Sequence, residues 1–162
     1  MWQGTVVSIH IAAAASQPLV AVAGVRAVAG RGLEGDRYFA GTGFYSARPA
    51  PIREVSLIEE ETLEALRRDH QLELAPGITR RNIVTRGVPL NHLVGREFRI
   101  GTAVLRGVQL CEPCQHVVDV TGIKALLPTL LHRGGLHAQV MASGIIGVGD
   151  AIADADGAIT QA

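Results

Sequence analysis

Short runs in which apolar and polar residues alternate recur along most of the chain, and glycines separate them. A period of two is typical of half-buried β-strands, and these runs are too short to be long helices. They lie at residues 5–11, 19–28, 53–57, 98–110, 136–141 and 144–152. Aromatic residues make up only 4% of the chain, so Val, Leu, Ile and Ala must fill the core, and 19 glycines serve the turns. The pattern predicts a mainly β, barrel-like fold of seven to nine short strands, as one domain over residues 1–162.

Two segments have helical spacing instead, and we expect them to pack outside the barrel. In the first, Ser56 and Glu59 resemble a capping box, and the acids at 59–61 and Arg67-Arg68 match the helix dipole. The second covers residues 123–131 and stops at Gly134-Gly135. Between the strands, residues 40–52 form a Gly- and Pro-containing loop, and Val117–Val120 is expected to continue a strand.

The longest alternating run leads into the two cysteines of the chain. Its even positions are apolar and are expected to face the core, namely Phe98, Ile100, Val104, Val108 and Leu110. The run therefore delivers Cys111 and Cys114 to the end of a strand or hairpin.

The charge pattern limits the partners. Fifteen basic residues balance fifteen acidic ones, so no overall field attracts nucleic acid or an anionic membrane. No apolar run reaches the roughly 18 residues of a membrane span, and no basic residue precedes the apolar part of the N-terminus as in a signal peptide. We expect a cytoplasmic protein with neither nucleic-acid nor membrane partners, and any anion site must be local.

Several uses of the Cys-x-x-Cys pair remain open. A structural zinc site would need two more ligands, which His116 and either His132 or His137 would have to supply. A thioredoxin-type dithiol would sit at a helix start after an early strand, and two buried thiols with no chemistry are a further alternative. A nucleophilic or sulfur-bearing cysteine is the fourth.

The fourth use requires cations, because a thiol of pKa near about 8.5 is only slightly ionised at neutral pH. Arg80, Arg81 and His116 are the candidates, with the distant His137 as a further neighbour. Paired arginines also make forked hydrogen bonds to phosphate, so a phosphorylated cofactor would fit beside the thiol. The alternative interpretation is that the two arginines form a solvated pair on the surface.

The segment GRGLEGDRYF at 30–39 combines three glycines with Asp36 and Arg37. It lacks the glycine order of a dinucleotide fingerprint and the Lys-Ser/Thr of a phosphate loop. It is either a sharp turn that approaches a ligand closely or an ordinary turn closed by a surface ion pair.

Five segments in order resemble the MOSC domain, the module at the C-terminus of molybdenum cofactor sulfurases. They are GLEGDRYF at 32–39, EVSLIEEETLEAL at 54–66, RRNIVTRGVPLNHLVGREFRIGTAVL at 80–105, LCEPCQHV at 110–117 and GIIGVGDAI at 144–152. The resemblance implies a β-barrel and a sulfur-carrier or sulfurtransferase role. It also implies a pocket for molybdenum cofactor (molybdopterin), or a related phosphorylated pterin, in which Arg80 and Asn82 match an Arg-x-Asn phosphate grip.

The same resemblance implies roles for the remaining site residues. Arg37, beside Asp36, is the nearest match to a basic residue that follows the glycine turn, and Arg81 and His116 would line the same pocket. Related stand-alone members keep the Pro-Cys pair without the earlier cysteine, which favours Cys114 as the sulfur carrier and Cys111 as a second thiol.

Two departures qualify the match. Relatives that ligate molybdenum use a late cysteine, where this chain has His132-Arg133-Gly134-Gly135-Leu136. The pyridoxal-phosphate region of the fused sulfurases also has no counterpart in 162 residues, so a separate cysteine desulfurase is expected to supply the sulfur. The competing function is a non-enzymatic module that binds a small anion or cofactor and has structural cysteines.

Overall fold

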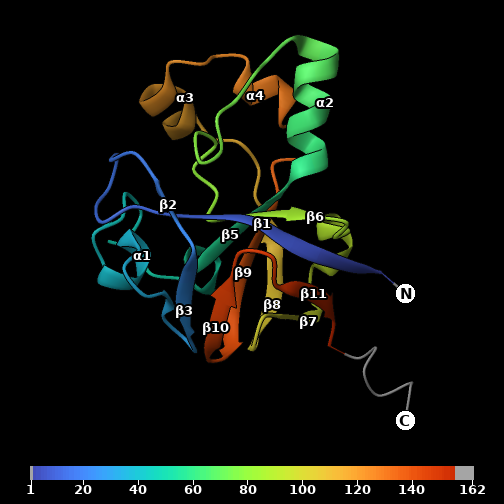
Figure 1. The fold of residues 1–162 in the computed structure, drawn as a ribbon. Helices are drawn as coiled ribbons and strands as arrows, with labels where there is room; N and C mark the ends of the chain where they lie inside the picture. Colours follow the sequence, from blue (N-terminus) through green and yellow to red (C-terminus); the bar gives the residue numbers. More distant parts are fainter. Residues whose placement is uncertain (1, 156–162) are drawn as a thin grey trace.

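The computed structural model describes residues 2–155, and a closed β-barrel of seven strands lies at its centre (Figure 1). The strands are β1 (Gln3–Ile11), β5 (Val55–Glu59), β6 (Ile83–Arg86), β7 (Glu97–Ile100), β8 (Ala103–Leu110), β9 (Leu136–Ala142) and β11 (Ala151–Asp154). They follow the order β11-β7-β8-β9-β5-β6-β1, and pairing of β1 with β11 closes the ring. All pairs are antiparallel except β5 with β6. Closure leaves the ring with no free edge. The predicted mainly β barrel is confirmed.

Four further strands lie outside the seven-stranded ring. β2 (Val20–Val22) adds to β1, while β10 (Gly144–Gly147), β3 (Gly24–Val28) and β4 (Gly32–Leu33) form a separate small sheet. The single strand predicted over residues 19–28 is therefore wrong, because the chain passes from one sheet to the other at Ala23.

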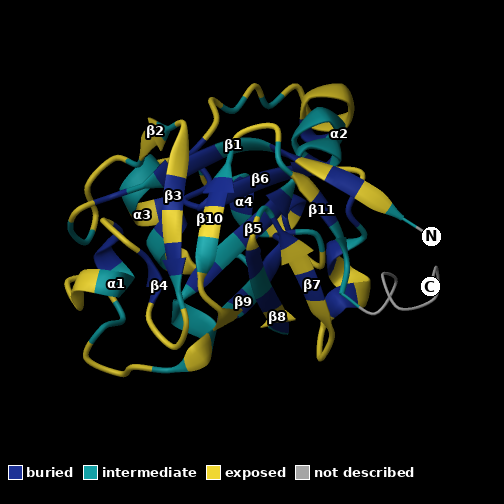
Figure 2. Cartoon of the chain, turned by 60° about the horizontal axis from the view of Figure 1, so that its bottom comes forward, coloured by how far each residue is buried: buried dark blue, intermediate teal, exposed yellow. Residues whose placement is uncertain are grey.

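Aliphatic side chains fill the barrel, as the composition predicts. Figure 2 shows buried positions alternating with exposed ones along several strands. The largest fully buried side chains include Phe98, Ile9, Leu57, Ile83 and Leu105. Each buried side chain of this kind stabilises the fold by about 1.5–3 kcal/mol relative to an exposed one. The barrel is therefore a packed core rather than a pore, and a ligand must bind at one of its ends or on its surface.

The hairpin of β7 and β8 reverses the predicted burial pattern. Phe98 and Ile100 are buried as expected, but on β8 the odd positions Ala103 and Leu105 face the core. The cause is the two-residue turn at 101–102, which pairs Ile100 with Ala103 on the same face. The expectation that Val104, Val108 and Leu110 face the core is therefore wrong, since all three are only half-buried.

Three helices gather at one end of the barrel (Figure 1). They are α2 (Glu60–His70), α3 (Gln115–Thr121) and α4 (Leu126–Thr129). They cover a second apolar cluster whose buried members are Ile58, Leu66, Val84, Val117, Val118, Leu126 and Leu130. Residues 2–155 also contain α1 (Arg37–Ala40) and two 3-10 turns, Pro51–Arg53 and Leu90–Leu93. The end under these helices is where the cysteine segment emerges.

Two local predictions around the helices are wrong. Val117–Val120 lies in α3 rather than in a strand, because burying Val117 and Val118 in the second cluster outweighs the β preference of valine. Ser56 makes no capping box, since it lies within β5 and α2 begins after Glu59 with no side-chain cap. The charge pattern of α2 is confirmed, with Glu60 and Glu61 in its first turn and Arg67 and Arg68 in its last.

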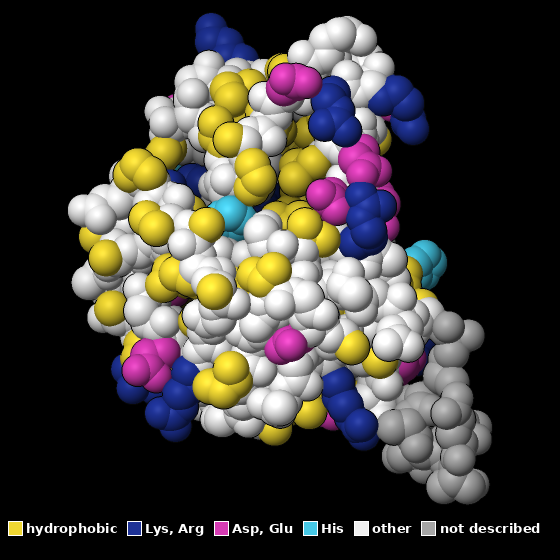
Figure 3. Space-filling view, viewed as in Figure 1, with side chains coloured by type: hydrophobic (Ala, Val, Ile, Leu, Met, Phe, Trp, Pro, Cys, Tyr) yellow, Lys and Arg dark blue, Asp and Glu magenta, His cyan; other side chains and the backbone are white. Residues whose placement is uncertain are grey.

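The charges of α2 belong to its solvated side. Figure 3 shows acidic and basic side chains gathered along the upper right of the molecule, where α2 lies. Arg86 of β6 forms ion pairs with both Glu60 and Glu64. In the part of the chain from 2 to 155, no helix is long and apolar enough to cross a bilayer.

Candidate functional site

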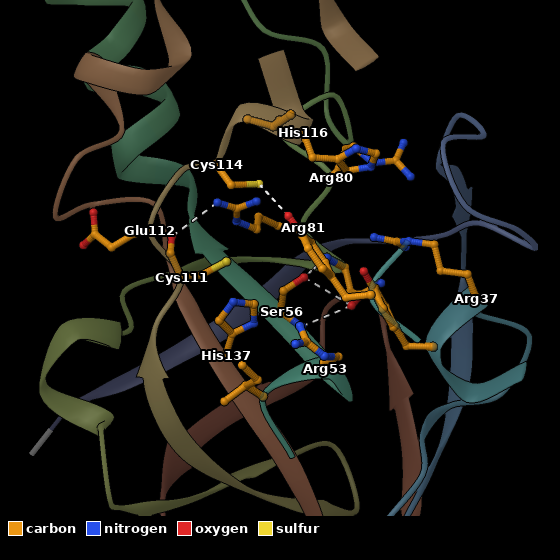
Figure 4. Close-up of a pocket in the computed structure, with 15 residues that line it drawn as sticks. Arg37, Arg53, Ser56, Arg80, Arg81, Cys111, Glu112, Cys114, His116 and His137 are labelled. Atoms are coloured by element: carbon orange, nitrogen blue, oxygen red, sulfur yellow. Dashed lines mark hydrogen bonds between the residues drawn. The ribbon is translucent and has the colours of Figure 1, made fainter. Parts of the chain in front are cut away.

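A pocket of about 240 Å³ lies at the end of the barrel, beneath α3 (Figure 4). Seven of the eight residues proposed from the sequence line it, namely Arg37, Arg80, Arg81, Asn82, Cys111, Cys114 and His116. They come from the start of α1, the turn before β6, and the segment after β8. The eighth, Asp36, is fully buried beside Arg37. The fold thus brings three distant segments together, while the chemical role of each residue stays a prediction.

Arg80 presents an unused hydrogen-bond donor in this pocket. The residue is only 8% exposed, and its Nη1 donates to the carbonyl of Gln17 at 2.7 Å. Its Nη2 is buried and has no hydrogen-bond partner. A buried unpaired donor on a charged group is costly, and such a group marks the place where an anion or another acceptor binds. Burial, and then the nearby Arg37, lower the pKa of Arg80.

The backbone of Arg80 is also unusual, with φ at 64° in the left-handed region. Non-glycine residues occupy this region at a cost of about 1–3 kcal/mol and do so chiefly at functional sites and turns. The side chain is buried and lines the pocket, and Arg81 is buried as well. The alternative of a solvated Arg80-Arg81 surface pair is therefore wrong.

Arg81 holds the walls of the pocket together. Its guanidinium donates to the carbonyls of Gly134 at 2.8 Å, Thr79 at 2.9 Å and Cys111 at 3.3 Å. None of these acceptors is a carboxylate, so the buried positive charge is hydrogen-bonded but not neutralised. Arg81 therefore fixes the Cys111 backbone and adds positive potential.

Asp36 and Arg37 form a buried ion pair instead of the surface pair that the glycine turn allowed. The Asp36 Oδ1 accepts from Arg37 Nη1 at 3.0 Å, and the carboxylate also caps α1 by accepting from the Tyr38 N–H. Three buried guanidinium groups, those of Arg37, Arg80 and Arg81, thus face one buried carboxylate. The pocket has an excess of positive charge although the chain as a whole is neutral.

Asn82 is occupied by the protein itself. Its side-chain nitrogen donates to the His10 carbonyl at 3.0 Å and to Asp36 Oδ1 at 3.4 Å. Its side-chain oxygen accepts from the backbone and hydroxyl of Ser56. With both ends of the amide used, Asn82 is placed to position Asp36 and β5, and direct contact with a ligand stays a prediction.

The two thiols differ in exposure. Cys111 is 4% exposed, and burial raises the pKa of its thiol, with Arg81 acting in the opposite direction. Cys114 is exposed and immediately precedes α3. Its sulfur accepts a hydrogen bond from the Tyr45 hydroxyl at 3.8 Å. Both cysteines are free thiols, and Figure 4 shows them on one side of the pocket with Arg37 on the opposite side.

The two histidines that line the pocket both have lowered pKa values. Burial, followed by the charge of Arg80, lowers the pKa of His116. Burial, with Arg81 and Arg53, lowers the pKa of His137 to about 4. The lowered pKa makes His116 a weaker source of positive charge than the arginines, and its role beside the thiol stays a prediction.

Sequence reasoning missed the loop that contacts the exposed thiol of Cys114. Phe44 stacks on the His116 ring at 3.9 Å between centroids, and Tyr45 reaches Cys114. Arg53 lies 5.0 Å from the centroid of the Tyr45 ring. The only signal was the length of the Gly- and Pro-containing loop at residues 40–52, which does not show what the loop contacts.

The zinc alternative is not supported by this arrangement. Among residues 2–155, no group of three or more His, Cys, Asp or Glu side chains is placed to hold a metal ion. His132 instead lies 3.4 Å from Glu112 as a largely exposed pair.

The segment that replaces the late cysteine of relatives packs against Cys111. The Cys111 N–H donates to the Gly135 carbonyl at 2.8 Å. A Cβ atom at position 134 would collide with the Cys111 carbonyl, and one at 135 with the Leu57 carbonyl. Residues 134 and 135 are therefore tied to glycine, and neither position has room for a thiol.

Comparison with known proteins agrees with the fold. The structure is similar to the YuaD protein from Bacillus subtilis, with a TM-score of 0.76 at 18% identity over 94% of this chain and 97% of that one. It is also similar to YiiM from Geobacillus stearothermophilus, with a TM-score of 0.68 at 16% identity over 93% and 74% of the two chains. YiiM from Escherichia coli matches with a TM-score of 0.64 at 20% identity over 95% and 69%. No curated protein matches the sequence.

A family model gives the assignment that these distant likenesses cannot. The model of the MOSC domain matches residues 45–153, which is more than half of the chain and includes both cysteines and the arginine pair. The chain therefore belongs to the MOSC domain family.

Proposed function

We propose that this domain is a sulfur carrier in which Cys114 holds a sulfur atom as a persulfide and passes it to an acceptor bound in the arginine-lined pocket. The observation that carries the proposal is that exposed Cys114 lines the same pocket as the unpartnered Nη2 of buried Arg80. A nucleophile and an anion-binding donor thus share one small space. This arrangement fits the family's link to sulfur and cofactor binding.

Loading follows ordinary thiol–persulfide exchange. The Cys114 thiolate attacks the outer sulfur of a desulfurase persulfide, and the desulfurase cysteine leaves as a thiolate. An acceptor nucleophile then attacks the outer sulfur of the Cys114 persulfide and regenerates the Cys114 thiolate. No net oxidation occurs in either step.

Cys111 serves as the second thiol in this scheme. Its attack on the inner sulfur of the Cys114 persulfide releases hydrosulfide and leaves a Cys111–Cys114 disulfide, which an external dithiol must reduce. Burial raises the pKa of Cys111, so it attacks more slowly than an exposed thiol and does not compete with loading.

The pocket fits the phosphate of a molybdenum cofactor or related pterin. The orphaned Arg80 Nη2 and the excess of buried guanidinium charge fit that group, with Arg80 and Arg37 as the residues that would hold it. When bound, such a cofactor would supply molybdenum redox chemistry. Arg81 would contribute chiefly through its charge, since each of its three guanidinium nitrogens already donates to a carbonyl.

The second candidate is a non-enzymatic module for a small anion, with cysteines that only pack. The unpaired donor of Arg80 favours it, because that observation does not involve either thiol. The exposure of Cys114 argues against purely structural cysteines, since an exposed thiol contributes little to packing.

Loading by a cysteine desulfurase distinguishes the two candidates. Wild type, Cys114→Ser and Cys111→Ser are incubated with desulfurase and cysteine, and the adducts are located by mass spectrometry after alkylation. The sulfur-carrier proposal expects one added sulfur on Cys114 in wild type and Cys111→Ser, and none in Cys114→Ser. Binding of inorganic phosphate without any added sulfur would favour the anion-binding module.

A further inference from the structure

More positively than negatively charged side chains line the pocket that contains the two thiols. Of the described residues, four arginines line it, namely Arg37, Arg53, Arg80 and Arg81, against one carboxylate, Glu112. Glu112 is exposed and also pairs with His132, while the buried Asp36 is taken up by Arg37 and three further donors. The site therefore keeps a net positive charge, with four guanidinium groups against two carboxylates.

We propose that the pocket accepts thiosulfate as a direct sulfur donor, so that Cys114 is loaded without a protein partner. This inference rests on the proposed role of Cys114 as sulfur acceptor, and it names a small sulfur oxyanion as the substrate class.

The electrostatic requirement of this reaction matches the pocket. A thiolate and a doubly charged oxyanion repel each other, and the repulsion is stronger in a partly buried site than in water. Cations that cannot lose their charge must offset it, and guanidinium groups stay protonated at any pH at which a protein is folded. Here two such groups, on Arg37 and Arg80, lie in the pocket wall with the thiols.

The unpaired donor gives the oxyanion a place to bind. Arg80 Nη2 is buried and unpartnered while its Nη1 is anchored to the Gln17 carbonyl, so the guanidinium is already fixed in position. Arg37 is anchored in the same way by Asp36. Fixed donors bind an anion at a lower entropic cost than mobile surface arginines do. Figure 4 shows Arg80 and Arg37 along the top and right of the pocket, with the two cysteines at its left.

Size favours a small anion. A volume of about 240 Å³ lies below the roughly 300–1,000 Å³ of pockets that enclose drug-sized ligands. A sulfur oxyanion needs only a few polar contacts and leaves room for the attacking thiolate.

The step balances without an added oxidant or reductant. The Cys114 thiolate forms a bond to the terminal sulfur of thiosulfate, the sulfur–sulfur bond of thiosulfate breaks, and sulfite leaves with the electron pair. The products are the Cys114 persulfide anion and sulfite. As negative charge shifts to the departing sulfite, the arginines stabilise it more strongly than the bound substrate, which is how a fixed cation lowers a barrier.

The test uses the full chain with thiosulfate as the only sulfur source, beside a parallel sample loaded by desulfurase and cysteine. The expected result is one sulfur added to Cys114 and one sulfite released per protein, with neither in Cys114→Ser. Arg80→Gln should slow loading by thiosulfate at least about tenfold, the effect of losing one hydrogen bond to a charged group. Arg99→Gln, on the exposed side of β7, should load as wild type does.

A second measurement covers the case in which Arg80→Gln fails to fold. Sulfate should inhibit thiosulfate loading of the wild type competitively, and chloride at equal ionic strength should inhibit it less. Loading by desulfurase but not by thiosulfate would overturn this inference and leave the sulfur-carrier function standing. Failure of both donors would overturn that function as well, and thiosulfate loading that sulfate does not inhibit would remove the arginine pocket from the reaction.

Discussion

The hydroxyl of Tyr45 donates a hydrogen bond to the sulfur of Cys114 at 3.8 Å. The two residues lie 69 positions apart in the sequence, and the stacking of Phe44 on His116 holds the loop that carries Tyr45 in place. Burial, and then the bond to Cys114, raise the pKa of Tyr45, so the phenol remains a donor at neutral pH. Both residues line the pocket, so Tyr45 contacts Cys114 where the thiol meets the pocket.

Replacing Tyr45 by Phe should slow the reaction of Cys114 with iodoacetamide at pH 7. The ring and its shielding remain, but the thiolate loses a hydrogen bond worth about 0.5 kcal/mol, which corresponds to a rate lower by about two- to threefold. Tyr38→Phe is the matched control. Tyr38 also lines the pocket, but the hydrogen bond to the Cys114 sulfur comes from Tyr45. An unchanged rate in Tyr45→Phe would mean that the bond does not influence the nucleophile.

Alkylation of the native protein should be selective for Cys114. Cys111 is 4% exposed and its pKa is raised by burial, so it holds less thiolate at neutral pH and offers little access. We expect Cys114 to be modified first, and Cys111 to be modified only at higher pH or after addition of urea. Peptide mass spectrometry over a series of pH values checks this, and equal modification at pH 7 would contradict the burial of Cys111.

His137 should make the protein less stable in weak acid. Its pKa is about 4 in the folded protein against 6.5 for an unperturbed side chain, so the unfolded chain binds the proton first. The contribution is therefore complete above pH 6.5 and is lost as the pH falls towards 4, by up to about 3 kcal/mol for a shift of this size. Glu54 and Glu59, whose pKa values burial raises, act in the opposite direction.

The difference between wild type and His137→Gln isolates this effect. Urea unfolding at pH 7 and pH 5 gives the two free energies of unfolding. The wild type should lose more stability between these values than His137→Gln does, while the exposed His92→Gln should behave as wild type. An equal loss in wild type and His137→Gln would show that His137 is protonated in the folded protein.

The sequence was informative about the barrel because strand periodicity is local. The alternation at residues 136–141 survives in β9, and residues 5–11 do form a strand, although a register shift between Val6 and Ser8 interrupts the alternation in β1. It failed where tertiary packing decides, as at Val117 and Val118, whose burial against α2 and α4 produces a helix. It also failed at residues 103–110, because the phase of a hairpin depends on its turn and not on the strand itself.

The site was predictable to the extent that its residues have unusual chemistry. A Cys-x-x-Cys pair and adjacent arginines are conspicuous, and the fold brings them into one pocket. Tyr45 and Arg53 carry no such pattern, since their roles arise from the contacts that the folded loop makes beside Cys114. The burial of Arg80 was equally invisible, because a left-handed backbone at a non-glycine residue has no signature in sequence.

Cys111 should accelerate the discharge of sulfur from Cys114. Cys111 and Cys114 are three positions apart and line one pocket. Thiol–disulfide exchange between them requires that their Cα atoms lie within about 7 Å. Persulfide-loaded wild type should release sulfide faster than loaded Cys111→Ser and accumulate the Cys111–Cys114 disulfide, read by mass spectrometry without reductant. Equal release with no disulfide would leave Cys114 as a lone carrier.

The central claim is that Cys114 carries transferable sulfur, and a single-turnover chase with labelled sulfur tests it most directly. The protein is loaded by desulfurase and isotopically labelled cysteine, separated from the desulfurase, and mixed with an excess of a small thiol. The account predicts that one labelled sulfur per chain sits on Cys114 before mixing and moves to the thiol afterwards, with no label retained by Cys114→Ser at any stage. Label that never reaches Cys114, or that stays on it through the chase, would contradict the account.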